Sequence, residues 1–164
     1  MKKLGLTGQR WLRAFHIFFA CAWIGASLSL ILMQIGLRAT DGGELYGIDA
    51  SMKYVDYYVI IPAAFGCLVT GFLISLLTKW GFFKFHWVTL KWVINVSAII
   101  FGTFWLGPWL NGMAPISRAE GLSALTNPIY LHLKQMNTWC AMVQHFVLLI
   151  AVYISIFKPW GMRK

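Results

Sequence analysis

Three ionisable side chains lie inside long apolar stretches of this sequence, and they are the first candidates for chemistry: His16, Lys91 and His145. An ionisable group within a lipid bilayer is costly, so it is usually retained where it contacts a partner, a proton path or a cofactor. We therefore treat each of the three as a candidate functional residue.

Helical periodicity aligns these residues with other polar or small ones. At 100° per residue, one face of the first apolar stretch carries His16, Trp23, Ser27 and Gln34. Equivalent faces of two later stretches carry Lys91, Asn95, Ala98, Gly102 and Trp105, and then Thr138, Ala141 and His145 with Gln144 beside them. Three polar faces on three helices predict a central cavity that holds a ligand.

Haem b, or a related porphyrin, is the ligand that these faces favour. Neutral imidazole is a usual axial ligand of haem iron, so His16 and His145 are candidate iron ligands, with Trp23 beside them on the cofactor-binding face. Arg13 and Lys91 are placed to neutralise the propionates. The alternative is that the two histidines only form hydrogen bonds between helices.

Depth in the membrane separates the two histidines. If the charged residues flanking the spans mark the inner interface, His16 lies about 4.5 Å deep, Lys91 about 10 Å and His145 about 20 Å, at 1.5 Å per residue. His16 and Lys91 then form the pair in one layer. A first helix that begins at Thr7 would place His16 at about 13 Å and keep ligation by both histidines open.

Lys91 has two predicted uses. Its amine either pairs with a propionate or reaches the inner headgroups on its long stem, or it acts as a catalytic residue that positions or deprotonates a substrate. Two further histidines are weaker candidates. We expect His86 at the interface and His132 above the membrane.

Copper is the second metal considered, and we expect it to be unlikely. Soft sulfur ligands suit Cu(I), but the methionines Met33, Met136 and Met142 are scattered and show no paired spacing. The cysteines occupy three different apolar stretches without a Cys-x-x-Cys motif: Cys21, Cys67 and Cys140. We expect them to be buried apolar residues.

The elements that must position these residues are membrane helices. The 164-residue chain is 59% hydrophobic and only 12% charged, whereas a soluble domain is about 25% charged. About 20 apolar residues cross the hydrocarbon core as a helix, and four stretches are long enough: 11–37, 57–77, 87–110 and 136–157. The sequence predicts an all-α integral membrane protein, one four-helix bundle over residues 1–164.

Charge predicts the orientation of this bundle. Nine basic residues flank the spans on the side of the termini, namely Lys2, Lys3, Arg10, Arg13, Lys79, Lys84, Lys158, Arg163 and Lys164. Only four lie on the other side, with all the acids. The positive-inside rule then places both termini in the cytoplasm. Anionic lipid headgroups account for the net charge of +9, so we expect the bilayer, and no nucleic acid, as the partner.

Local signals add four expectations. Pro62 should kink the second span, and the small residues Ala63, Cys67, Gly71 and Ser75 should let another helix approach closely. Ser117 to Glu120 has the spacing of a capping box, which predicts a short helix at the outer surface. Asn127 followed by proline predicts the start of the last helix, which should run to Lys158.

The stretch WLRAFHIFFACAWIG resembles the opening helix of two small bacterial membrane families, the copper-resistance D (CopD) family and the haem-containing protoporphyrinogen oxidase (HemJ) family. In the latter, a histidine on the first helix and a lysine on a later helix form the functional pair; His16 matches the histidine and Lys91 the lysine. Over nearly its full length, through IPAAFGCLVTG and FKPWG, the chain also resembles bacterial integral membrane proteins without an assigned function.

The residues and these resemblances together leave three classes of function in the bacterial inner membrane. The first is a haem-binding redox protein, either an electron carrier or a quinone-linked or protoporphyrinogen oxidase-like enzyme, with a quinone or porphyrin as partner. The second is a copper-handling protein. The third is a structural subunit without a cofactor, in a homo-oligomer or a larger membrane complex.

Overall fold

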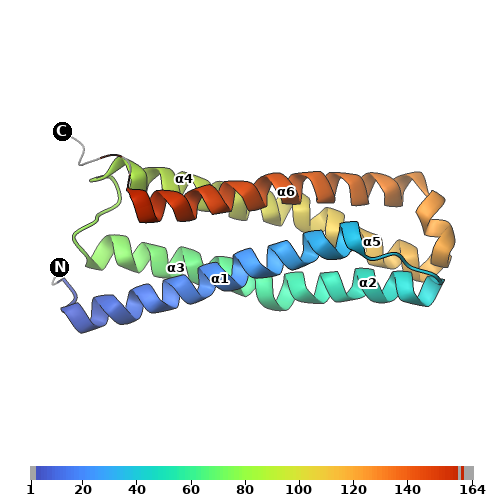
Figure 1. Ribbon diagram of the computed structural model, residues 1–164, viewed down its shortest axis with the longest axis horizontal. Coiled ribbons are helices and arrows are strands. Elements are labelled where there is room, and N and C mark those ends of the chain that lie inside the picture. The colour runs from blue at the N-terminus through green and yellow to red at the C-terminus, as the bar shows by residue number, and fades with distance from the viewer. Residues whose placement is uncertain (1–2, 159, 161–164) are drawn as a thin grey trace.

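The computed structural model describes residues 3–158 and 160, and this part of the chain is all-helical (Figure 1). The elements are α1 (Leu6–Gly36), α2 (Gly42–Val55), the π-helix η1 (Asp56–Ile60), α3 (Ile61–Leu77), α4 (His86–Phe101), the π-helix η2 (Gly102–Leu106), α5 (Gly107–Glu120), the 3-10 helix η3 (Gly121–Thr126) and α6 (Pro128–Phe157). Lys2, Arg163 and Lys164, three of the basic residues counted above, lie outside the described residues.

Four long rods form an elongated bundle, because α2, η1 and α3 run on without a break, as do α4, η2 and α5. The first and last described residues and the α3–α4 connection lie together at one end, here called the termini end (Figure 1). The linker 37–41 and η3 lie at the opposite end, here called the far end. Even the shorter rods, of 31 and 30 residues, are about 45 Å long.

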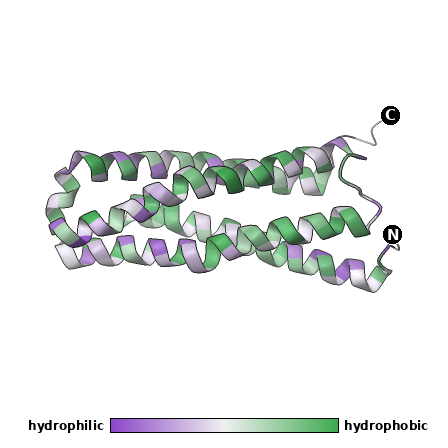
Figure 2. Ribbon diagram, turned by 180° about the vertical axis from the view of Figure 1, so that it is seen from behind, coloured by the Kyte–Doolittle hydropathy of each residue, from purple (hydrophilic) through white to green (hydrophobic). Residues whose placement is uncertain are grey.

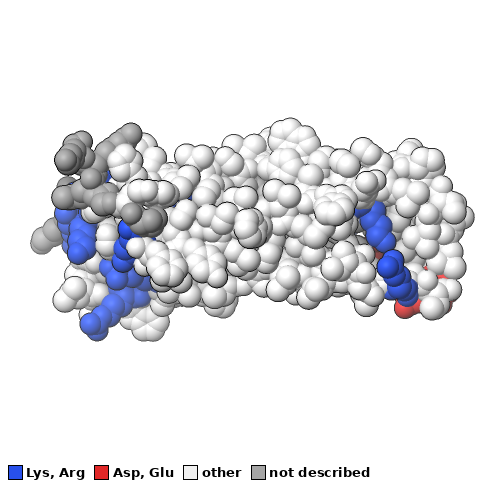
Figure 3. Space-filling model, turned by 45° about the horizontal axis from the view of Figure 1, so that its top comes forward, with Lys and Arg blue, Asp and Glu red and all other residues white. Residues whose placement is uncertain are grey.

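Each rod is long and apolar enough to cross a membrane, which confirms the predicted all-helical bundle with four membrane-length helices. Hydrophobic residues dominate the middle of the rods (Figure 2). On the face shown in Figure 3, Lys and Arg gather near the two ends and leave a wide uncharged belt between them. The four rods thus have the length and composition of the helices of a multi-pass membrane protein, and they are longer than the roughly 30 Å of a hydrocarbon core.

Two prolines explain the two π-helices. Proline has no N–H, and its ring clashes with the carbonyl four residues before it. Pro62 and Pro108 each follow a π turn by two residues, and the widened turn is closed just before each proline, by Ile61 N–H to Asp56 O and by Gly107 N–H to Gly102 O. The chain therefore accommodates Pro62 with a π turn, and the kink predicted there stays a prediction.

The predicted outer helix beginning at Ser117 is wrong. These residues form the last turn of α5, which continues past Pro115 and ends at Glu120, with Gly121 as its C-cap at a φ of +58°. Ser117 is buried and donates to the carbonyls of Met113 and Ala114 in its own helix, so it caps nothing. The spacing matches a capping box, but Ser117 lies inside α5 and not at the start of a helix.

The other helix start was predicted correctly. Asn127 caps α6, and its side chain accepts hydrogen bonds from the N–H groups of Ile129 at 2.8 Å and Tyr130 at 3.4 Å. The second rod begins earlier than the predicted span, at Gly42, because Asp41 caps α2 through the N–H of Glu44.

The small-residue stripe of α3 was predicted to let another helix approach closely, and in the structure that helix is α1. Ala63, Cys67 and Ser75 are buried, and the neighbouring Gly66 lies against a ring of α1, since a Cβ there would be 2.5 Å from Phe19. At the other end of the stripe, a Cβ on Gly71 would meet the imidazole of His16 at 3.5 Å. The close approach of α1 and α3 therefore sets the position of the first candidate residue.

Candidate cofactor site

A cavity of about 570 Å³, here called the inner cavity, lies between α1, α3, α4 and α6 in the half of the bundle nearest the termini end. Ligand pockets in proteins usually measure about 300–1,000 Å³. Apolar and aromatic side chains dominate its walls, including four tryptophans, Trp23, Trp80, Trp87 and Trp92. Its size and lining suit a flat, largely apolar molecule.

His16 lines the inner cavity and is held by one hydrogen bond. Its Nδ1 lies 2.8 Å from Thr70 Oγ1, and the same hydroxyl lies 2.6 Å from the carbonyl of Gly66. A carbonyl can only accept, so the single hydroxyl proton of Thr70 is used there and the hydroxyl oxygen accepts from His16. Nδ1 of His16 therefore carries the proton, and Nε2 keeps its lone pair for a ligand. Histidines that bind metals are held in this way.

The α4 side of the inner cavity supplies polar groups. Lys91 lines it, with its ammonium 5.8 Å from the centre of the Trp87 ring. Asn95, one turn further along α4, has a buried Oδ1 without a hydrogen-bond partner in the described part of the chain. Arg13 lines the cavity from α1. Two cations and a free amide oxygen are thus available to a ligand with polar substituents.

The structure brings four of the five predicted site residues to this one cavity, namely Arg13, His16, Trp23 and Lys91. The fifth, His145, is not among the residues that line it. Its Nδ1 lies 2.7 Å from Ser27 Oγ, and Ser27 is 11 residues beyond His16, about 16 Å further along α1. The structure therefore does not place the two histidines on opposite sides of one ligand.

His145 nevertheless has the same kind of hydrogen bond as His16. Ser27 Oγ also lies 3.0 Å from the carbonyl of Ile24, to which it donates, so its oxygen accepts from Nδ1 of His145. Nearer the far end, Gln34 donates to Asn137 and accepts from Thr138. The polar faces predicted for α1 and α6 thus contact each other directly.

The inner cavity is open on one side. The lining residues of α1 and α6 include strongly exposed apolar ones, such as Ile17 at 60% and Ile156 at 66% exposure. On the opposite side it is closed by buried residues of α3 and α4, such as Cys67 and Trp87. The opening between α1 and α6 therefore lies along the side of the bundle.

Of the remaining candidates, Cys21 and Cys67 also line the inner cavity, whereas His86, His132 and Cys140 do not. His86 and His132 are exposed on α4 and α6. All three cysteines are free thiols, but only Cys67 is buried, so the expected burial is wrong for Cys21, which is exposed, and for Cys140, which is half-buried. Met33 lines a different cavity, at the far end, which includes neither of the other two predicted methionines. In the described residues, no group of three or more His, Cys, Asp or Glu side chains could hold a metal ion.

Sequence reasoning missed the contribution of α3. Thr70 fixes the tautomer of His16, and Ser75 accepts a hydrogen bond from the indole of Trp92 at 3.1 Å, which ties α3 to α4. The small-residue stripe was the available signal, because the residues beside such a stripe lie at the same helix interface.

The residues of the inner cavity fit a porphyrin. One imidazole nitrogen is free and held in orientation, and glycine at position 71 leaves space beside the ring. Cations and a buried amide oxygen without a partner in the described chain lie along the same walls. The chain matches no protein-family model, no curated protein and no solved structure.

Proposed function

We propose that this chain binds one b-type haem, or a related porphyrin, in the inner cavity and acts in redox chemistry within the bacterial cytoplasmic membrane. The observation that carries the proposal is the meeting of His16, with Nε2 free, and Lys91 in one apolar cavity of about 570 Å³.

Each polar group of the cavity has a role in this proposal. His16 would hold the haem iron through Nε2, and the Nδ1–H bond to Thr70 would orient the ring and make it more basic. Lys91 and Arg13 neutralise the propionates. The tryptophan-rich walls exclude water and provide a low-dielectric environment, which tunes the reduction potential. The haem supplies one-electron chemistry, and the protein supplies binding and orientation.

The side opening favours a partner that is dissolved in the membrane. The opening is bordered by exposed apolar residues of α1 and α6, such as Ile17 and Ile156, and lies along rods that are apolar enough to cross the bilayer. A quinone or a porphyrin can approach such an opening from the lipid, whereas a soluble electron carrier cannot. The proposed redox partner is therefore a lipid-soluble quinone or porphyrin.

The proposed orientation places the termini end in the cytoplasm. Six basic residues of the described chain belong to that end, namely Lys3, Arg10, Arg13, Lys79, Lys84 and Lys158. The far end has fewer basic residues and carries four of the five acids, Asp41, Glu44, Asp49 and Glu120, whereas Asp56 lies in η1 between α2 and α3. The positive-inside rule supports this orientation, and with it a haem in the cytoplasmic half of the membrane.

The visible spectrum of the purified protein tests the proposal. We expect a Soret band that shifts on reduction with dithionite, lost in His16→Ala and kept in His132→Ala, whose histidine is exposed. A protein without a Soret band after expression with sufficient haem, and after reconstitution with haemin, would contradict haem binding. Equal haem content in both variants would remove His16 from the site.

A further inference from the structure

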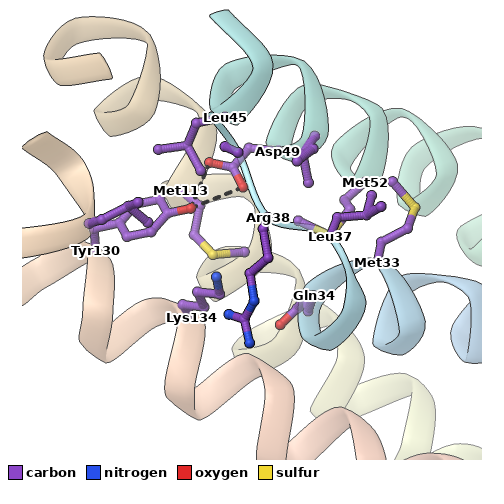
Figure 4. Close-up of a pocket in the computed structure, with 13 residues that line it drawn as sticks. Met33, Gln34, Leu37, Arg38, Leu45, Asp49, Met52, Met113, Tyr130 and Lys134 are labelled. Carbon is purple, nitrogen blue, oxygen red and sulfur yellow. Dashed lines mark hydrogen bonds between the residues drawn. The ribbon is translucent and has the colours of Figure 1, made fainter. Parts of the chain in front are cut away.

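A second, smaller cavity of about 90 Å³ lies at the far end of the bundle and is here called the far-end cavity (Figure 4). The end of α1, the linker 37–41, α2, α5 and the first turns of α6 surround it. Its rim includes the exposed residues Leu37, Arg38 and Leu125. Arg38 lies outside the helices, in the linker, so this rim is at the end of the bundle and not along its apolar sides.

A buried carboxylate forms part of its wall. Asp49 is only 1% exposed, and its two oxygens lie 3.3 and 3.1 Å from the hydroxyl of Tyr130, which is equally buried. That hydroxyl has one proton to donate, whereas a carboxylate has about four lone pairs. Among the residues drawn in Figure 4, these are the only hydrogen bonds, and the hydroxyl of Ser117 is a second donor close to the carboxylate. Two hydroxyl donors do not use all the lone pairs of a carboxylate, so Asp49 keeps acceptor capacity on a cavity wall.

Two cations face the same space from other elements. In Figure 4, the side chain of Arg38 extends from the linker and that of Lys134 from α6, and neither is joined by a dashed line to another residue drawn. Arg38 is exposed and Lys134 half-buried. The charged groups of the lining are one arginine, one lysine and one aspartate, so the formal charge of the cavity is 1 + 1 − 1 = +1.

This charge disfavours a metal cation, although three methionines, Met33, Met52 and Met113, also line the cavity. Met52 and Met113 are buried in the hydrophobic core at this end, where methionine commonly fills space. An anion suits the two cations, but a simple anion would be repelled by Asp49. A ligand that combines a carboxylate with a hydrogen-bond donor satisfies all three groups.

We propose that the far-end cavity binds a small carboxylic acid that carries a hydroxyl or amino group on the neighbouring carbon. The carboxylate is held by Arg38 and Lys134, and the hydroxyl or ammonium group donates to Asp49. The volume of about 90 Å³ limits the ligand to a few heavy atoms. The site is independent of the inner cavity, with which it shares no lining residue.

Calorimetric titration of the purified full-length protein with glycolate, glycine and acetate tests this proposal. We expect glycolate or glycine to bind at least tenfold more tightly than acetate. Arg38→Gln should weaken that binding tenfold or more, and Asp49→Asn should remove most of the preference over acetate. Arg118→Gln is the matched control, because Arg118 is an exposed arginine of the same end that stacks on Tyr46 and does not line the cavity.

Every outcome decides the proposal. Equal affinity for acetate and glycolate would overturn the role of Asp49, and absence of binding by glycolate and glycine would overturn the site. Preferential binding of Cu(I), lost in Met113→Leu, would replace it by a metal site. If Asp49→Asn fails to fold, Arg38→Gln still tests the site, since Arg38 is an exposed linker residue. His16→Ala should bind glycolate normally, which separates this result from haem binding.

Discussion

The replacement Thr70→Val tests the hydrogen bond that holds His16. Valine keeps the branched shape of threonine but removes the hydroxyl, so Nδ1–H of His16 loses its acceptor at 2.8 Å. Thr70 is buried. A water molecule could take the place of its hydroxyl only if the α1–α3 interface opened. The imidazole would then be free to rotate or to change its tautomer, which removes Nε2 from its ligand position.

The expected magnitude follows from this loss. Removing the outer-shell partner of a metal-binding histidine typically weakens metal affinity by about 10–100-fold, which corresponds to roughly 1.4–2.8 kcal/mol. Leaving the buried Nδ1–H of His16 without an acceptor costs about 1–3 kcal/mol. This cost is similar in size to the expected loss of binding free energy. We therefore expect Thr70→Val to weaken haemin binding by about one to two orders of magnitude.

The assay is a titration of the apoprotein in detergent with haemin, followed by Soret absorbance. Thr103→Val is the matched control, because Thr103 donates to the carbonyl of Ile99 at 2.8 Å as Thr70 donates to that of Gly66, but no histidine bonds to it. Thr70→Ser should restore the affinity. Equal haemin affinity in the two valine variants would refute the reasoning, and a defect that serine does not rescue would assign it to packing.

Three further predictions concern orientation, packing and Lys91. In a background without native cysteines, Leu122→Cys should label from outside intact cells and Lys84→Cys should not; the reverse pattern would contradict the orientation. Gly66→Ala should lower the thermal unfolding midpoint, because the added Cβ would lie 2.5 Å from the Phe19 ring. Gly25→Ala is the control and should not lower it, because nothing lies within 4 Å of the added Cβ. Equal midpoints in the two variants would argue against the close α1–α3 contact. If Lys91 only neutralises propionates, Lys91→Arg should keep both the haem content and the rate of quinol oxidation. If its amine acts as a base, Lys91→Arg should keep the haem but lose turnover. An unchanged rate in Lys91→Met would exclude both roles.

Much of the fold was predictable because lipid leaves few alternatives. Backbone groups in a bilayer must be paired internally, so long apolar stretches become helices whatever their neighbours are. The same constraint made the α1 and α6 polar faces predictable, and Gln34, Asn137 and Thr138 do meet across that interface. Local signals without this constraint were less reliable, as Ser117 shows, since a capping pattern has no effect inside a helix that continues through it.

Composition and periodicity were enough to predict the helical class, the four membrane-length rods and the candidate pair His16 and Lys91, because both act along one helix. What each histidine contacts depended instead on the packing of the helices. Thr70 lies 54 residues after His16 in the sequence, and Ser27 lies 118 residues before His145. In the far-end cavity, Asp49 and Tyr130 form a hydrogen bond although they are 81 residues apart. Such contacts depend on how helices cross and on the small residues at the crossings, which periodicity along one helix does not specify.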